Sequence, residues 1–351
     1  MLDKVNGQDL WVSIYTLLLA AAGAAVAYVL NVPVYILVGP ALAVSLAGLS
    51  GRRFAVDDRI RDAAFIFLGI GIGAGITPEA MGAFLRWPLA FAVLAVLLVA
   101  IMVVSSLVLA RGFGYDARSA TLASAPGHLS FVISMAASLN LDVARISIAQ
   151  SVRLLALTLC VPAIAAAFGV DASARILPPG ENMGALIIVG LWLASLGFGL
   201  ILQRLRMPAP LLMGGLILSG ICHATGIVPQ VLPEPIALAS FLVLGALIGT
   251  RFSGVSVTAL RSAALAGVAT TAVAVFFAAL GAVPVAWALD MAPEHVLVAF
   301  APGGLETMIA MGLALGANPG FVAACHVARL LILSGLVPVF MGRADAAQGQ
   351  S

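Results

Sequence analysis

The sequence contains two copies of one unusual block, and this duplication restricts the folds that the chain can adopt. The first copy reads APGHLSFVISMAASLNLDVARISIAQSVRLL and begins at Ala125, and the second reads APGGLETMIAMGLALGANPGFVAACHVARLL and begins 176 residues later at Ala301. Upstream of the blocks, Gly69 corresponds to Gly245 at the same shift. The register therefore extends well beyond the block, and two related halves are expected.

Composition places both halves in a membrane. The 351 residues are 62% hydrophobic and 9% charged, whereas a soluble domain has about 25% charged residues. The net charge of +2 favours no polyanionic partner, and no stretch is left to form a nucleic-acid-binding domain. The three cysteines stand alone in apolar runs without CxxC spacing, which predicts neither a disulfide framework nor a metal site: Cys160, Cys222 and Cys325.

The apolar runs predict an all-α polytopic membrane protein with two inverted repeats, each of five transmembrane helices plus a broken re-entrant helical hairpin. The first repeat covers 1–168, with spans at 11–30, 33–50, 61–77, 84–110 and 142–168 and a broken segment at 116–139. The second covers 184–343, with spans at 184–203, 207–223, 233–250, 258–289 and 318–341 and a broken segment at 294–316. A linker is expected at 169–183 and a disordered tail at 344–351.

The inverted arrangement follows from the placement of arginines. Cytoplasmic loops carry an excess of Lys and Arg, so the loop at 51–62, with four arginines, is placed in the cytoplasm. In the second half the basic residues have moved to the other loops, after its first and third spans. Both halves satisfy the rule only if they are inverted, which puts both termini in the cytoplasm.

The two Ala-Pro-Gly breaks are the first candidate site. Proline is favoured in the first helical turn, so Pro126 and Pro302 are expected to start half-helices that end near Leu139 and Leu315. Helix N-termini attract anions, and glycine lets the backbone approach a ligand. The broken segments predict an anion site that includes Gly127, Gly303 and Gly304. The alternative is a pair of kinked, water-capped helices.

Two arginines and one carboxylate fall at membrane depth. Arg153 and Arg329 occupy equivalent positions near the middle of the last span of each half. An embedded arginine needs a partner, and Glu306 is the one carboxylate well inside a predicted span. A structural ion pair is one interpretation. The other is that the surplus positive charge binds an anionic solute, with a carboxylate held by two parallel hydrogen bonds.

Three further polar residues belong to the candidate substrate-binding set. His326 lies three residues before Arg329, on the same helical face, Gln150 holds the equivalent place before Arg153, and His128 sits at the first break. A neutral histidine there could carry a proton, or these residues could simply tune a polar pocket. Asp142 and Asn318 are expected to cap helices. Gly69, Gly71 and Gly73 are expected to allow close helix packing rather than nucleotide binding.

The doubled block resembles the signature of the bacterial AbrB-duplication membrane proteins, and the resemblance extends over nearly the whole chain. It implies a multi-pass protein of the bacterial inner (cytoplasmic) membrane. Members of that family carry labels such as AbrB-family regulator and ammonia monooxygenase. No catalytic residue is carried over from the family. Position 128 is His where the second copy has Gly304, so the two half-sites are not equivalent.

These observations favour a secondary transporter that moves a small anionic solute. One alternative is a membrane-embedded ligand sensor that affects gene expression indirectly, and a less favoured one is a membrane monooxygenase. No catalytic triad, metal-ligand spacing or phosphate-binding loop is visible, so neither an enzyme nor a cofactor is expected. The expected partners are the lipid bilayer, the solute and, through the glycine-rich third span, a second copy of the chain.

Overall fold

The helices occur in the same order in the two halves of the sequence. The computed structural model describes residues 7–76, 87–127, 129–167, 177 and 180–348. The first half forms α1 (Gly7–Val29), α2 (Tyr35–Gly48), α3 (Asp58–Gly73), α5 (Pro88–Phe113), α6 (Ala117–Ser124), α7 (Leu129–Ser138) and α8 (Val143–Ala167). The second half forms α9 (Ala185–Arg204), α10 (Pro210–Ala224), α11 (Glu234–Thr250), α12 (Val257–Leu289), α13 (Pro293–Phe300), α14 (Leu305–Ala314) and α15 (Pro319–Gln348). A shift of 176 carries the bounds of α6 and α7 onto those of α13 and α14.

Unusual backbone conformations repeat with the sequence. Val34 and Ala209, which precede α2 and α10, have φ values of 51° and 46°. Gly114 and Asp290, which follow α5 and α12, have φ values of 63° and 54°. Left-handed conformations are uncommon for non-glycine residues and costly for valine. Their recurrence at matching positions shows that the two halves share local structure as well as sequence.

Six helices in the described residues are long and apolar enough to cross a membrane, and they form three equivalent pairs: Leu10–Val29 with Ala185–Arg204, Trp87–Phe113 with Val257–Leu289, and Val143–Ala167 with Pro319–Gly342. The other four expected spans are shorter. They form α2, α3, α10 and α11, with 14, 16, 15 and 17 residues. A helix of that length covers at most about 26 Å, less than the roughly 30 Å hydrocarbon core. Membrane crossing by these four stays a prediction.

The chain divides into two compact units, and each contains helices from both halves. The first unit comprises Met1–Phe84, Pro162–Val255 and Glu306–Phe321, and the second comprises Leu85–Val161, Ser256–Leu305 and Val322–Ser351. The repeat boundary and the unit boundary therefore do not coincide. The contacts between helices, and not the linker between the repeats, decide which segments fold together.

In the first unit the two halves exchange equivalent contacts. Helix α3 packs on α10, and α11 packs on α2. A Cβ added at Gly73 would lie 2.6 Å from the carbonyl oxygen of Leu216, and one at Gly245 would lie 2.6 Å from that of Leu37. The expectation that the glycines of the third span serve helix packing is confirmed. Because α10 covers this face within the chain, these glycines provide no argument for a second copy.

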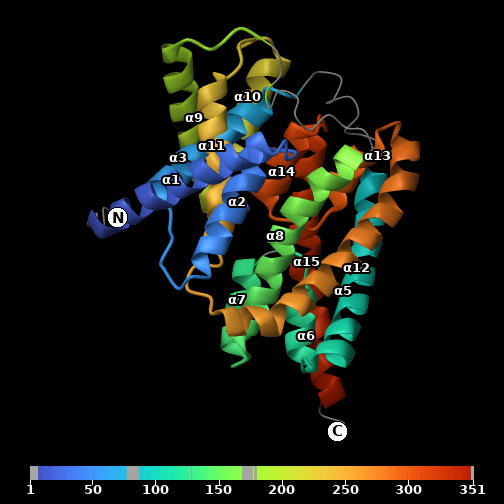
Figure 1. Cartoon of the computed structure of the whole chain (residues 1–351). Coiled ribbons are helices and arrows are strands. Elements are labelled where there is room, and N and C mark those ends of the chain that lie inside the picture. The colour runs from blue at the N-terminus through green and yellow to red at the C-terminus, as the bar shows by residue number, and fades with distance from the viewer. Residues whose placement is uncertain (1–6, 77–86, 128, 168–176, 178–179, 349–351) are drawn as a thin grey trace. The chain divides into compact units, whose positions relative to one another are not determined.

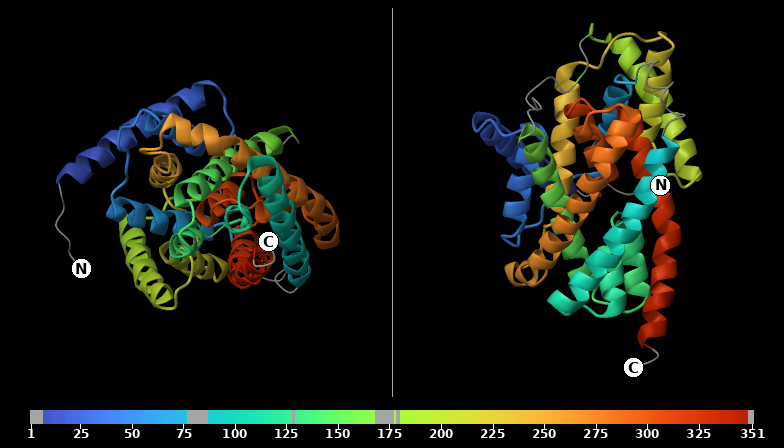
Figure 2. Two further views of the ribbon diagram at one scale, coloured as in Figure 1. Left: turned by 90° about the horizontal axis from the view of Figure 1, so that it is seen from below. Right: turned by 90° about the vertical axis from the view of Figure 1, so that its right-hand side faces the viewer.

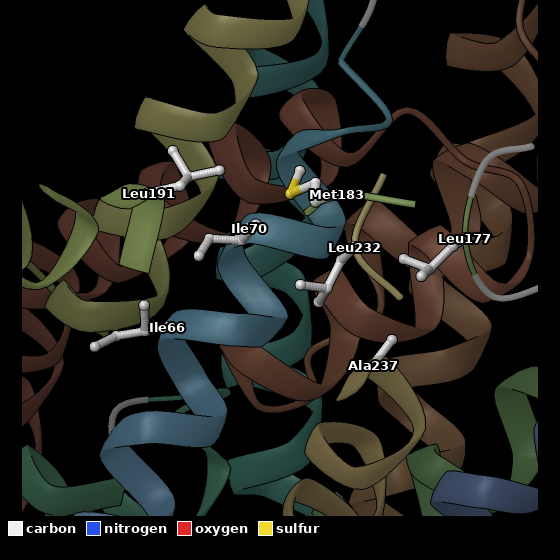
Figure 3. Packing of buried hydrophobic residues seen from close by; sticks show 7 residues of the cluster. All are labelled: Ile66, Ile70, Leu177, Met183, Leu191, Leu232 and Ala237. Carbon is white, nitrogen blue, oxygen red and sulfur yellow. The ribbon is translucent and has the colours of Figure 1, made fainter. Parts of the chain in front are cut away.

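A hydrophobic cluster fills the space between α3, α9 and α11 in the first unit (Figure 3). Its buried members are Ile66, Ile70, Leu177, Met183, Leu191, Leu232 and Ala237. A second cluster contains Ala20 and Ala246, and Ala246 corresponds to Ile70 at the 176-residue shift. The duplicated sequence therefore builds two related pieces of apolar core within one unit.

The second unit pairs α5 with α12 (Figure 1). The views agree that these two helices run in opposite directions (Figures 1 and 2). Helix α6 packs against α5, and α13 packs against α12. Figure 1 also shows α8 and α15 running in opposite directions. The two broken segments are therefore followed by long helices that run opposite to each other.

Candidate functional site

Both expected breaks are present. Helix α6 ends at Ser124 and α7 begins at Leu129, and α13 ends at Phe300 while α14 begins at Leu305. The half-helices start three residues after the prolines, not at them. In the first break Gly127 has φ +118°, and in the second the amide of Gly303 donates to the oxygen of Ala301 at 2.8 Å. These tight turns occupy the residues that would otherwise form the first helical turn.

The embedded arginines bind the main chain of the breaks in the same way in both halves. Arg153 Nη2 donates to the oxygen of Ala125 at 3.3 Å, and Arg329 Nη1 donates to the oxygen of Ala301 at 3.1 Å. Each bond joins residues 28 apart. The exposed fractions of the two arginines are 2% and 1%. The last carbonyl groups of a helix have no hydrogen-bond donor within that helix. At the ends of α6 and α13, each guanidinium donates a hydrogen bond to one such carbonyl oxygen beside its own break.

Gln150 supports Arg153 in the first half. Its Oε1 accepts from Arg153 Nη2 at 3.2 Å, and its Nε2 donates to the oxygen of Leu122 at 2.9 Å. The side chain is buried. Gln150 therefore connects the arginine to the last turn of α6, and its two bonds fix which way the amide points.

His326, at the equivalent position, makes a different contact. Its Nδ1 lies 3.0 Å from the oxygen of Val322, one turn earlier on α15. The side chain is fully buried, and its ring also interacts with the backbone of Ala301 in the second break. The two half-sites are therefore chemically different.

Arg329 contacts both breaks. Its Nη2 donates to the oxygen of Gly303 at 2.7 Å, and a Cβ added at Gly127 would lie 3.4 Å from its Nε. The first break, from one half of the sequence, and the second break, from the other, therefore meet at this one guanidinium. Proximity of the two breaks is the arrangement on which the sequence-based site depends.

Three of the remaining predicted site residues lie at the breaks, and two do not belong to this described site. Pro126 and Pro302 are buried within the breaks, and Gly304 is half-buried beside the second. His128 lies outside the described residues. Glu306 belongs to the first unit, where its charge acts on Arg251. In the second unit, main-chain carbonyl oxygens accept the hydrogen bonds of the buried arginines, a role for which the sequence had suggested Glu306.

The expected helix caps are confirmed. The side chain of Asp142 accepts from the amide of Arg145 at 2.9 Å, and that of Asn318 accepts from the amide of Phe321 at 3.1 Å. These equivalent residues start α8 and α15, the helices that carry the arginines. The sequence therefore predicted the side chains that cap these helices, but it did not predict the carbonyl groups that bind the guanidinium groups.

The main-chain partners were missed because a carbonyl group has no sequence signature. The signal available was the constant spacing of 28 residues between the alanine of each break and the following arginine. Among the described residues, Nε of Arg153 and Nε of Arg329 have no hydrogen-bond partner after these bonds are counted. No group of three or more His, Cys, Asp or Glu side chains suited to a metal ion occurs among the described residues.

Comparisons with known proteins show which family the chain matches. A family model described as "Transition state regulatory protein AbrB" matches residues 36–344. A protein named "Uncharacterized protein YhjN", from Bacillus subtilis (strain 168), is 24% identical over 314 residues, which are 84% of this chain and 79% of that protein. No solved structure matches the chain.

Proposed function

We propose that this chain, which belongs to the AbrB family, is a secondary transporter for a small anionic solute. The observation that carries the proposal is the pair of buried arginines at two helix breaks, each with an Nε–H that has no partner in the described part of the chain. Unsatisfied buried donors of charged groups are costly, and broken backbone at membrane depth is tolerated only inside protein or along a wet cavity. An oxyanion supplies both the missing charge and the missing acceptors.

An inverted arrangement of the two repeats is part of the proposal. The opposite directions of α5 and α12, and of α8 and α15, support it (Figure 1). In transporters built from inverted repeats, discontinuous helices form the substrate site at the repeat interface. We place the protein in the bacterial inner membrane with both termini in the cytoplasm, because this orientation satisfies the positive-inside rule in both halves.

The test is anion flux into liposomes that contain the purified full-length chain. We expect saturable uptake of at least one small carboxylate or inorganic oxyanion, and we expect Arg329→Gln and Arg153→Gln to reduce it by about tenfold or more, the effect of losing roughly 1.4 kcal/mol. The matched control is Arg261→Gln, which removes an exposed guanidinium from the same unit. Flux that is unchanged in both buried-arginine variants would place the site elsewhere.

The description of the matched family favours a second candidate, a membrane-embedded regulator that binds the solute without moving it. The same two guanidinium groups would then form a ligand site in a sensor. Saturable binding to the purified protein with no net flux in liposomes would favour this function. Uptake above that of protein-free liposomes would favour transport.

A further inference from the structure

The second unit holds two buried positive charges at one place. Arg153 bonds to the oxygen of Ala125, and Arg329 lies against Gly127. Ala125 and Gly127 are two residues apart, which is at most about 7 Å of extended chain. The two guanidinium groups are close enough for the charge of Arg153 to act on Arg329. Arginine stays charged in proteins, so both charges persist.

Among the described residues of this unit, no carboxylate forms an ion pair with either arginine. The sequence of the unit contains five carboxylates, and all five lie at or near helix ends: Asp116, Asp142, Asp290, Glu294 and Asp345. Asp116 and Asp142 already accept hydrogen bonds from main-chain amides as caps of α6 and α8. Buried charge without a partner is strongly unfavourable, and Glu306, the carboxylate next in sequence to the second break, acts on Arg251 in the other unit, so a bound anion is the remaining source of negative charge.

We infer that the ligand of this site is a small dianion whose two charges are carried by oxygen atoms. The inference rests on the proposed function, because it names the solute class for the same site. A monoanion would leave one of the two buried guanidinium charges uncompensated. A dianion neutralises both, and its binding removes the repulsion between two like charges in a medium of low dielectric constant.

The remaining donors fit this ligand. Both terminal nitrogens of Arg329 donate to carbonyl oxygens of the second break, and Nη2 of Arg153 donates to Ala125 and Gln150. Each arginine retains one unpartnered Nε–H. The end-on, two-nitrogen fork of Arg329 is therefore occupied, and the ligand receives one directed Nε–H from each arginine. A dicarboxylate or a tetrahedral oxyanion has enough oxygen atoms to accept a hydrogen bond from each Nε–H.

The experiment compares anions that differ in charge at similar size. Affinity for the purified full-length protein is measured by calorimetry with succinate and with monomethyl succinate, which lacks one charge. Acetate, sulfate and phosphate complete the series. We expect succinate, sulfate or both to bind at least about tenfold more tightly than either monoanion. Phosphate binding should strengthen between about pH 6 and 8, as the dianion forms, while sulfate serves as the control of constant charge.

The outcomes separate this inference from the proposed function. Equal affinity for succinate and monomethyl succinate, with measurable flux of either, would overturn the dianion inference and leave transport standing. Absence of binding and flux for the whole series would overturn both. Binding of sulfate and phosphate without succinate would support an inorganic dianion, and the reverse would support a dicarboxylate.

A charge-removing variant gives a second readout. Arg153→Gln should lower the preference for succinate over monomethyl succinate to about threefold or less, because one buried charge then remains, and Arg261→Gln should preserve it. If Arg153→Gln does not fold, the comparison of ligands on the wild-type protein decides the question alone. A well-folded Arg153→Gln protein that keeps the full preference would contradict the assignment of the two charges to the arginines.

Discussion

At the scale of single residues, Gly127 has a backbone conformation that favours glycine and lies against the guanidinium of Arg329. Its φ of +118° is strained for any residue with a side chain, and a Cβ there would lie 3.4 Å from Arg329 Nε and 3.6 Å from Nη2. Gly303, its sequence equivalent, does not have a positive φ. The two breaks therefore share their sequence but differ in backbone geometry.

We expect Gly127→Ala to destabilise the protein by about 1–3 kcal/mol, the usual cost of a strained backbone conformation. Thermal unfolding of the purified variant measures the change. The control is Gly112→Ala in α5, where an added Cβ meets nothing within 4 Å and alanine favours the helix by up to about 1 kcal/mol. Equal melting temperatures for Gly127→Ala and wild type would contradict the strained geometry of the first break.

The sequence predicted which residues belong to the candidate site better than it predicted their bonds. The duplicated spacing placed Arg153 and Arg329 in equivalent positions, and the structure confirms equivalent bonds to Ala125 and Ala301. A carboxylate partner was expected because side chains are visible in a sequence. The carbonyl partners become available only when a turn frees them from the helix, and that turn depends on three-dimensional packing.

At the scale of elements, the short helices rely on close backbone approach. A Cβ at Gly73 in α3 would lie 2.6 Å from the oxygen of Leu216, and one at Gly249 in α11 would lie 2.5 Å from Cβ of Val44. Small residues at these positions let the neighbouring backbones approach closely, which strengthens van der Waals contact between the helices.

Gly73→Val and Gly249→Val should each separate a helix pair and destabilise the first unit by about 1–3 kcal/mol or more. Because the two positions are equivalent, we expect similar losses in both variants. The recovery of monodisperse protein on size-exclusion chromatography measures the effect. Gly190→Val, where nothing lies within 4 Å of the added Cβ, should behave as wild type. If it aggregates equally, valine propensity rather than packing would be responsible.

The start of α6 gives a pH dependence. Burial acts to raise the pKa of Asp116, but hydrogen bonds from Ser119 and Arg118 outweigh it, and the pKa lies below the ordinary 3.8. A carboxyl whose pKa is lower in the folded state stabilises that state above its unfolded pKa. This stability is lost as pH falls through the folded pKa.

Asp116→Asn keeps a capping side chain but removes the charge. The wild type should therefore exceed the variant in thermal stability at about pH 5 and above, and the difference should shrink as pH falls below about 4. Melting temperatures across this range test the prediction. A difference that grows toward low pH would reverse the sign and exclude a stabilising carboxylate at this cap.

At the scale of the whole molecule, the duplicated order of helices was predictable, whereas the composition of the compact units was not. Period and hydropathy indicated each helix, and every expected span contains one. The repeats divide the sequence into two halves, and each compact unit combines helices from both halves. Contacts such as α3 with α10 decide this grouping, and no local pattern reports which distant helix will be a neighbour.

The proposed inverted arrangement of the two repeats makes a direct prediction about the sides of the membrane. In a variant whose native cysteines are replaced, Gly114→Cys should be protected from a membrane-impermeant maleimide in intact cells, and Asp290→Cys should be labelled. The two positions are equivalent in sequence and in backbone conformation. Both should react after permeabilisation. Labelling of both in intact cells would mean that the halves face the same way.

Arg329 holds the carbonyl oxygens of the second break and rests against the glycine of the first. A displacement of its guanidinium disturbs both turns at once, since neither turn can relax without losing the same neighbour. One buried side chain therefore couples the conformations of the two breaks, so that neither turn changes independently of the other.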